Sequence, residues 1–186
     1  MKVIILRGPS GSGKTTWQKK NHPTAWVCSA DSYFMKDGYA GTVLHPKSVY
    51  DFDPRKLPEA HALCMETFLE GIKHKEPVIV VDNTNTRTWE WDKYKSIAEL
   101  CGYEVDVLEF LPKTIEQLRM MIDRNEHNVP LTVIAEQALR FESHPDSVQA
   151  LVFERVLTPE QSESLKEAEK RPPSTVVTRQ LPSRRG

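Results

Sequence analysis

The sequence predicts an α/β fold in which helices flank a central parallel sheet, and three observations support this prediction. Short apolar segments alternate with segments of helical periodicity along most of the chain. The segment from Pro77 to Asp82 is apolar without alternation, which is typical of a central parallel strand covered on both faces. A glycine-rich turn joins the first apolar segment to the first helical one. Parallel strands in this order require right-handed helical crossovers.

The first half of the chain predicts two strands and two helices. Lys2 to Leu6 is rich in β-branched residues and predicts a buried strand, and Thr15 to Lys20 predicts the helix that follows. Ala25 to Cys28 predicts a second short strand. From Met35 to Asp53, glycines, a proline and mixed polarity predict a loop or irregular insertion. Because Asp53 precedes a proline, it predicts a helix start, and apolar residues at helical spacing extend this helix to about Lys75.

The second half continues the alternation after the strand that ends at Asp82. Apolar residues from Tyr94 to Cys101 predict a helix, and Tyr103 to Phe110 predicts another strand. Thr114 and a glutamine three residues later form a capping-box pattern, which predicts a helix start. Leu131 to Phe141 predicts a further helix.

Composition and charge exclude several classes of protein. The chain has 186 residues, of which 39% are hydrophobic and 27% charged, so most of it is predicted to be globular. Its 25 Lys and Arg against 26 Asp and Glu give a formal charge of -1, which argues against a basic coat for nucleic acid. The sequence has no apolar run of membrane-spanning length, no signal-peptide layout at its start and no CxxC motif among three cysteines. We therefore predict a cytoplasmic protein with no membrane partner.

The chain divides by composition into three parts. Residues 1–150 carry the alternating pattern and are predicted to form the α/β domain. Residues 151–170 form a charged C-terminal extension that contains one candidate helix from Pro159 to Lys170. Residues 171–186 contain three prolines, four arginines and no acidic residue, which predicts a flexible basic tail.

The turn after the first strand matches GxxxxGK[ST], the pattern of a phosphate-binding loop (P-loop). Glycines let consecutive N–H groups face phosphate oxygens, and the helix N-terminus adds positive potential. Lys14 is predicted to reach the β- and γ-phosphates, and Thr15 to ligate Mg²⁺. The alternative is a glycine-rich turn without a ligand, but the strand before it and the helix after it favour phosphate binding. The predicted ATP-binding residues here are Gly8, Pro9, Ser10, Gly11, Ser12, Gly13, Lys14, Thr15 and Thr16.

Asp31 comes just after the second predicted strand. In a parallel sheet that carries a P-loop, this end of the strand faces the bound phosphates. A carboxylate at this place can accept the proton of an attacking hydroxyl and direct its oxygen at the γ-phosphorus. Because Asp31 also precedes a possible helical turn, helix capping is an equally good interpretation of its position.

Asp82 follows the strongest predicted strand and occupies the place of a Walker-B acid. We expect it to hold Mg²⁺ directly or through water. Asn83, Thr84 and Asn85 come next and supply neutral hydrogen-bonding groups for a substrate or for shaping the loop. The alternative for this segment is an Asx-type turn between strand and helix.

Arg124 ends a predicted helix beside the polar break from Asn125 to Pro130. A lid that closes over ATP needs cationic donors, and a guanidinium suits the equatorial oxygens of a phosphoryl group. The alternative is an arginine placed at a helix C-terminus by the helix dipole.

Together these residues resemble the polynucleotide 5′-hydroxyl kinase family of P-loop kinases, over about Met1 to Ser143. The resemblance implies a kinase fold with a short helical lid, in which Asp31 is the general base and Arg124 contacts the ATP phosphates. The motifs that carry it are Gly8 to Thr16, Ser29 to Phe34, Phe52 to Pro54, Glu59 to His61, Val78 to Thr86, Trp89-Glu90 and Arg124 to Pro130.

Two departures from the family pattern concern the acceptor. Phage members carry an arginine shortly after the catalytic aspartate, where it binds the acceptor's phosphate, and here Phe34 stands at that place. Residues 126–128 replace a second lid arginine. For a polynucleotide acceptor, Arg55, Arg87 or the basic tail would then supply the missing charge, and we count Arg87 among the predicted substrate residues.

The resemblance implies an ATP-dependent kinase that moves the γ-phosphate to a hydroxyl, with Mg²⁺ and ATP as cofactors. The leading acceptor is the 5′-hydroxyl of DNA or RNA, which implies a role in nucleic acid repair. Two alternatives stay open. The same machinery would serve a small-molecule or modified-base hydroxyl, and a chain that binds ATP without catalysis would be an interaction module.

Overall fold

The computed structural model describes residues 1–36, 49–123 and 129–150. Met1–Phe153 separates as one compact unit of the chain. The predicted C-terminal extension and basic tail, residues 151–186, lie outside the described residues. None of the helices within the described ranges combines the length and apolarity that a bilayer span requires.

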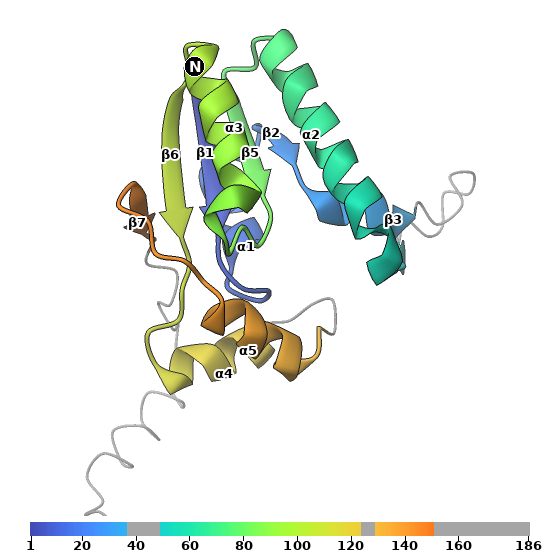
Figure 1. The fold of residues 1–186 in the computed structure, drawn as a ribbon, viewed down its shortest axis with the longest axis vertical. Coiled ribbons are helices and arrows are strands. Elements are labelled where there is room, and N and C mark those ends of the chain that lie inside the picture. The colour runs from blue at the N-terminus through green and yellow to red at the C-terminus, as the bar shows by residue number, and fades with distance from the viewer. Residues whose placement is uncertain (37–48, 124–128, 151–186) are drawn as a thin grey trace, which may run out of the picture. The chain divides into compact units, whose positions relative to one another are not determined.

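A five-stranded parallel sheet forms the centre of this unit, which confirms the predicted α/β fold (Figure 1). Its strand order is β2-β5-β1-β6-β7. β1 lies between β5 and β6, so that Ile4 is opposite Val80 on one side and Asp106 on the other. The strands are β1 (Lys2–Arg7), β2 (Trp26–Cys28), β5 (Val78–Asp82), β6 (Glu104–Glu109) and β7 (Ser147–Gln149).

Helices cover both faces of the sheet because successive side chains of a strand point to opposite faces. Val3 and Ile5 of β1 pack in the larger core cluster with α2 (Leu57–Lys73) and α3 (Thr88–Leu100). Ile4 and Leu6 pack on the other face, against residues that include Trp17 of α1 (Lys14–Asn21). Burial on both faces explains why the strands β1 and β5 are continuously apolar.

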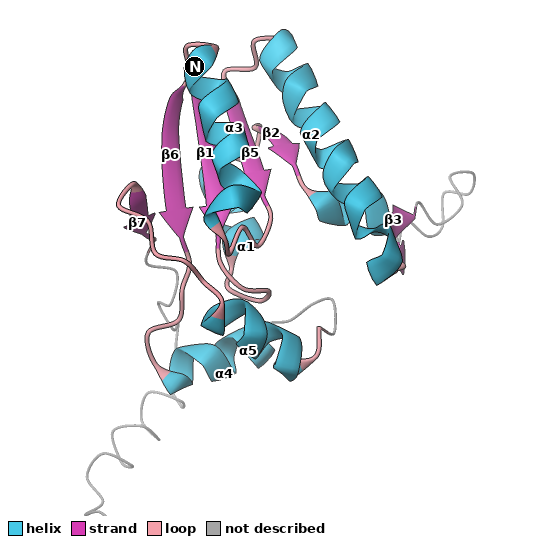
Figure 2. Cartoon of the chain, viewed as in Figure 1, coloured by secondary structure: helices cyan, strands magenta, loops and turns pink. Residues whose placement is uncertain are grey.

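The carboxyl ends of the strands carry the remaining short elements. The 3₁₀ helix η1 (Ala30–Phe34) follows β2 directly. The helices α4 (Ile115–Asp123) and α5 (Leu131–Leu139) lie beyond the ends of β1 and β6 (Figure 2). Parallel strands therefore bring the P-loop, η1 and the loop after β5 to one edge of the sheet.

Three features differ from the sequence-based expectation. The irregular segment after η1 contains two short antiparallel strands, β3 (Met35–Lys36) and β4 (Val49–Tyr50), and β7 was not expected at all. Strands of two or three residues are too short to show alternation, and tertiary partners decide them. Asp53 caps the turn η2 (Pro54–Lys56), where its side chain accepts a hydrogen bond from Arg55 N, and α2 begins only after this turn.

Candidate functional site

The P-loop leads from the end of β1 into α1, as its motif predicts. Gly8 N donates a 2.8 Å hydrogen bond to the carbonyl oxygen of Thr84, which joins the start of the loop to the segment after β5. Gly13, the residue before α1, has a φ of 90°, a conformation that favours glycine. Thr15 and Thr16 follow in the first turn of α1 and are exposed. The loop therefore places its amides and two hydroxyls at the carboxyl edge of the sheet.

The side chain of Lys14 lies inside the P-loop, where it is 8% exposed. Its Nζ donates to the carbonyl oxygens of Gly8 at 2.9 Å and of Pro9 at 3.0 Å. Burial lowers the pKa of Lys14, while the carboxylates of Asp82 and Asp31 raise it. Oxygen atoms of the loop itself thus hold the ammonium group of Lys14 inside the P-loop.

Thr15 and Asp82 meet where the P-loop helix approaches the end of β5. Thr15 Oγ1 donates a 2.7 Å hydrogen bond to Oδ2 of Asp82, whose residue is 7% exposed. Burial raises the pKa of Asp82, and both the Lys14 ammonium and the Thr15 hydrogen bond lower it. The carboxylate of Asp82 therefore contacts the first turn of α1. A hydroxyl and a carboxylate are ligand types suited to Mg²⁺, which also takes phosphate oxygens.

Asp31 lies in η1 and is exposed. Ser29 occupies the cap position of this short helix, because its Oγ accepts a 3.3 Å hydrogen bond from Asp31 N. The N-cap of η1 is therefore Ser29, and Asp31 lies in the first turn. Ala30 N donates a 2.8 Å hydrogen bond to Oδ1 of Asn83, which ties the residue before Asp31 to the residue after Asp82.

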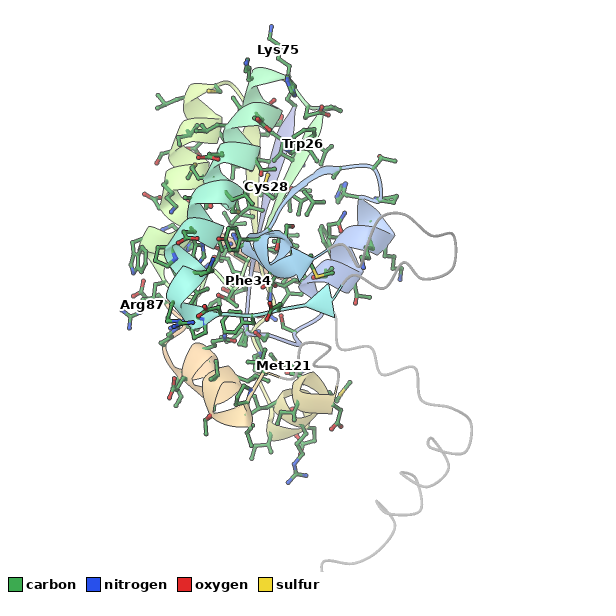
Figure 3. The ribbon with its side chains drawn as sticks, turned by 90° about the vertical axis from the view of Figure 1, so that its right-hand side faces the viewer. Trp26, Cys28, Phe34, Lys75, Arg87 and Met121 are labelled. Carbon is green, nitrogen blue, oxygen red and sulfur yellow. The ribbon has the colours of Figure 1, made fainter. Side chains whose placement is uncertain are left out.

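The segment after Asp82 is held by its own side chains. Asn83 is buried, and both ends of its amide contact protein groups, Ala30 N and Cys64 Sγ. Asn85 Nδ2 donates to the carbonyl oxygen of Leu6 at 2.8 Å, and its φ of 45° makes the turn that this contact requires. Arg87, another predicted substrate residue, is exposed, and its side chain points away from the fold (Figure 3).

The two positions that depart from the family pattern differ in what surrounds them. Phe34 is buried and packs edge-on against the rings of Tyr33 and Phe52, inside the fold (Figure 3). An apolar core contact thus takes the place of a charged group. Arg124 and residues 125–128, the centre of the predicted lid, lie outside the described residues.

A buried arginine that the sequence reasoning missed joins three parts of the site. Arg7 ends β1 directly before the P-loop. Its Nε donates to Asn85 O at 3.0 Å, and its two terminal nitrogens donate to Ser147 Oγ at 2.5 Å and to Glu142 O at 2.6 Å. The guanidinium carbon also lies 4.8 Å and 4.5 Å from the ring centroids of Trp91 and Phe141. The sequence feature that could have indicated this role is a charged residue at the end of a predicted buried strand.

The helices beyond the sheet also touch the P-loop. Ser10 N donates a 2.9 Å hydrogen bond to Oε1 of Gln137 on α5. The carbonyl oxygen of Met121 on α4 lies against Gly11. No local pattern in the sequence predicts either contact, because the partners are more than one hundred residues apart.

The described residues offer the predicted magnesium ligands but no larger metal cluster. Residues 1–36, 49–123 and 129–150 contain no group of three or more His, Cys, Asp or Glu side chains arranged for a metal ion. A cation held by Thr15 and Asp82 would therefore complete its coordination with water molecules or with oxygen atoms of a bound phosphate.

Comparison with known proteins places this site in a family. Residues 3–144 match the family model of the AAA domain AAA_33. Human NEDD4-binding protein 2 is 30% identical over 167 residues, which is 83% of this chain, and the chain spans only 8% of that relative. A putative kinase from Chloroflexus aurantiacus shares the fold with a TM-score of 0.54 at 10% identity, covering 90% of this chain and 95% of the other.

A second solved structure has the same fold around a bound nucleotide analogue. Chaetomium thermophilum Kti12 in complex with ADP-AlF3 aligns with a TM-score of 0.50 at 13% identity, over 90% of this chain and 96% of that chain. The family match spans the P-loop, η1, the loop after β5 and both distal helices. The chain therefore belongs to the AAA_33 family of AAA domains, and its fold is that of the P-loop kinases.

Proposed function

We propose that this chain is an ATP-dependent kinase that transfers the γ-phosphate to the 5′-hydroxyl of DNA or RNA. The observation that carries the proposal is the attachment of η1, which contains Asp31, to the segment after β5, which itself is bonded to the P-loop. The 2.8 Å hydrogen bond between Ala30 N and Asn83 holds η1 beside Asp82. The negative charge of Asp31 raises the pKa of both Lys14 and Asp82, which agrees with a carboxylate at the same edge of the sheet.

On the donor side, the P-loop would hold Mg²⁺-ATP. The backbone amides from Gly8 to Gly13 would surround the phosphates, and Lys14 would neutralise the β- and γ-phosphates. Thr15 and Asp82 would hold Mg²⁺, which supplies charge neutralisation when bound. Arg124, as the lid arginine, would add a guanidinium to the transferring group. The ADP-AlF3 complex of Kti12 agrees with a nucleotide donor in this fold.

On the acceptor side, Asp31 would be the general base. Its carboxylate accepts the proton of the acceptor hydroxyl as that oxygen forms a bond to the γ-phosphorus. The bond between the γ-phosphorus and the β–γ bridging oxygen breaks at the same time, and ADP leaves. The protein's contribution is mainly positioning and charge neutralisation, because phosphoryl transfer needs little covalent help.

A polynucleotide acceptor is supported by the family resemblance and by two exposed side chains at the start of α3. Arg87 is exposed, and Trp89 is 66% exposed. A cation beside an aromatic face is the combination that binds single-stranded nucleic acid, through phosphate contact and base stacking. Trp91, by contrast, is fully buried and packs in the core, so it is unavailable for stacking.

The test is transfer of labelled γ-phosphate from ATP to a panel of acceptors. The panel pairs DNA and RNA oligonucleotides that end in a 5′-hydroxyl with the same oligonucleotides ending in a 5′-phosphate, and adds nucleosides and sugars. We expect label only on the 5′-hydroxyl oligonucleotides. Asp31→Asn should lower kcat by about 10²–10⁴-fold with the KM for ATP unchanged, because only the base is lost.

The matched control is Asp106→Asn, which removes an exposed carboxylate from β6 that pairs with Lys2 at 3.0 Å. This variant should transfer phosphate like the wild type. Label on a nucleoside or sugar alone would replace the polynucleotide with a small-molecule acceptor. ATP binding without transfer to any acceptor would favour an interaction module, and full activity of Asp31→Asn would exclude Asp31 as the base.

A further inference from the structure

A line of buried hydrogen bonds leads from α3 to the residue before Asp31. Tyr94 OH donates to Cys64 Sγ at 3.5 Å, and Asn83 Nδ2 donates to the same sulfur at 3.3 Å. Asn83 Oδ1 in turn accepts the hydrogen bond from Ala30 N at 2.8 Å. All four residues are 9% exposed or less. α2, α3 and the end of β5 thus converge on the start of η1.

Each member of this line has a defined chemical role. The carbonyl oxygen of Asn83 must face Ala30, because the amide nitrogen carries only donors and would oppose another N–H. The nitrogen must then face Cys64, whose sulfur accepts from both neighbours. Burial raises the pKa of the Cys64 thiol, so the sulfur is a neutral and weak acceptor. The amide of Asn83 is therefore fixed at both ends.

We propose that Asn83 and Cys64 are positioning residues for Asp31, which they orient through the backbone of Ala30. This inference rests on the proposed role of Asp31 as the general base. Asp31 is an exposed residue in a helix of one short turn, and a short helix depends on outside contacts for its orientation. The contact with Asn83 fixes η1 relative to Asp82, so the base and the metal-binding carboxylate keep a constant separation.

A purely structural role for these residues predicts a different pattern of effects. Cys64 and Tyr94 both belong to the larger core cluster, so any truncation also removes packing. Packing depends on shape, whereas positioning depends on particular donor and acceptor atoms. Cys64→Ser keeps an acceptor for Asn83, and Cys64→Ala removes it. Tyr94→Phe keeps the ring, which packs edge-on against Phe68, and removes only the hydroxyl.

The first measurement is amide hydrogen exchange at Ala30, which needs no substrate. We expect exchange to be about ten-fold faster in Cys64→Ala, because Asn83 loses the contact that fixes its amide. Cys64→Ser should restore slow exchange. The control is Tyr103→Phe, which removes another buried hydroxyl whose partner is Glu76 O, 3.2 Å away and before β5. Wild-type exchange at Ala30 in both Cys64→Ala and Tyr94→Phe would overturn the proposal.

The second measurement is a double-mutant cycle with Asp31→Asn. Cys64→Ala should lower kcat for phosphoryl transfer about ten-fold and leave the KM for ATP unchanged. In the Asp31→Asn background the same substitution should have no further effect, because the oriented group is gone. Equal losses of kcat in both backgrounds would indicate a structural role and overturn the proposal. If Cys64→Ala does not fold, Tyr94→Phe takes its place in the cycle.

The two proposals fail in distinguishable ways. If Asp31→Asn transfers phosphate like the wild type, the proposed base is wrong, whatever the exchange experiment shows. If Asp31→Asn loses transfer while Cys64→Ala and Tyr94→Phe keep the wild-type kcat, Asp31 remains the base and the positioning role is wrong.

Discussion

The carbonyl oxygen of Met121 faces Gly11 so closely that a Cβ on the glycine would lie 2.1 Å from it. Gly11 also has a φ of 74°, which a side chain disfavours. We expect Gly11→Ala to lower the free energy of unfolding by about 3 kcal/mol, because strain adds to the displacement of α4. ATP affinity should fall as well, since the P-loop must shift. Chemical denaturation and ATP titration measure the two effects.

Gly102→Ala separates backbone strain from this contact. Gly102 has a φ of 79°, and a Cβ there would meet nothing within 4 Å. This variant should lower the free energy of unfolding by only about 1 kcal/mol and bind ATP normally. Equal losses of stability in the two variants would mean that α4 does not press on the P-loop.

Arg7→Lys should be strongly destabilising although it keeps the positive charge. A lysine provides one nitrogen where the guanidinium provides three, which bind Asn85 O, Glu142 O and Ser147 Oγ. One buried acceptor and two partly buried ones would then compete for a single nitrogen, so we expect a loss of about 3 kcal/mol in urea denaturation. Arg55→Lys, at an exposed arginine paired with Asp53, should leave the denaturation midpoint unchanged. A wild-type midpoint for Arg7→Lys would show that the three contacts do not stabilise the fold.

Asp82→Asn should make the nucleotide-free protein more stable at neutral pH. Burial raises the pKa of Asp82 above 3.8, although Lys14, Thr15 and Lys19 lower it and Asp31 raises it further. Folding therefore disfavours the charged form, and this cost applies at a pH above the folded pKa. Asparagine avoids the cost and still accepts the Thr15 hydrogen bond.

The advantage of Asp82→Asn should shrink as the pH falls through the folded pKa, and it should vanish below the unfolded value of 3.8. Thermal unfolding from pH 8 to pH 4 measures this dependence. Transfer activity should fall in the same variant, because a neutral amide is a poor Mg²⁺ ligand. A wild-type melting temperature at pH 8 would mean that the buried carboxylate carries no net cost.

Thr15→Ala should weaken the binding of the Mg²⁺ that transfer requires, through the loss of one hydroxyl ligand. We expect the Mg²⁺ concentration for half-maximal rate to rise about ten-fold, whereas Thr15→Ser keeps the hydroxyl and should behave like the wild type. Rates measured across a MgCl2 series, with EDTA as the zero point, test this. Identical series for the alanine and serine variants would exclude Thr15 as a metal ligand.

Local patterns in the sequence predict most of the sheet and its helices. β1 and β5 are apolar runs because both of their faces are buried. α2 and α3 show helical spacing of apolar residues because one face of each is buried. The order of apolar residues in the sequence therefore predicts these elements. β3, β4 and β7 each have three residues or fewer, which is too short for a sequence pattern to predict a strand. These strands form because they pair with other segments of the chain.

Part of the candidate site could likewise be predicted from local sequence patterns, and part depends on contacts between distant segments. The P-loop, Asp31 and Asp82 stand at strand ends, where topology alone brings them to one edge. The contacts of Arg7 with Glu142 and of Ser10 with Gln137 join segments that lie far apart in the chain. Such contacts follow from the tertiary packing and cannot be predicted from local sequence. The same holds for Asn83, which looked like a substrate contact from its position and whose amide is engaged by Cys64 and Ala30.

The three cysteines give the natural chain a single convenient handle for labelling. Cys28 and Cys64 are buried, and burial raises the pKa of both thiols, so they react slowly with maleimides. Cys101 is exposed and caps α3 at the end opposite Thr88. A fluorophore or a surface tether on Cys101 would leave the P-loop edge facing solution, so binding can be followed without engineering a new cysteine.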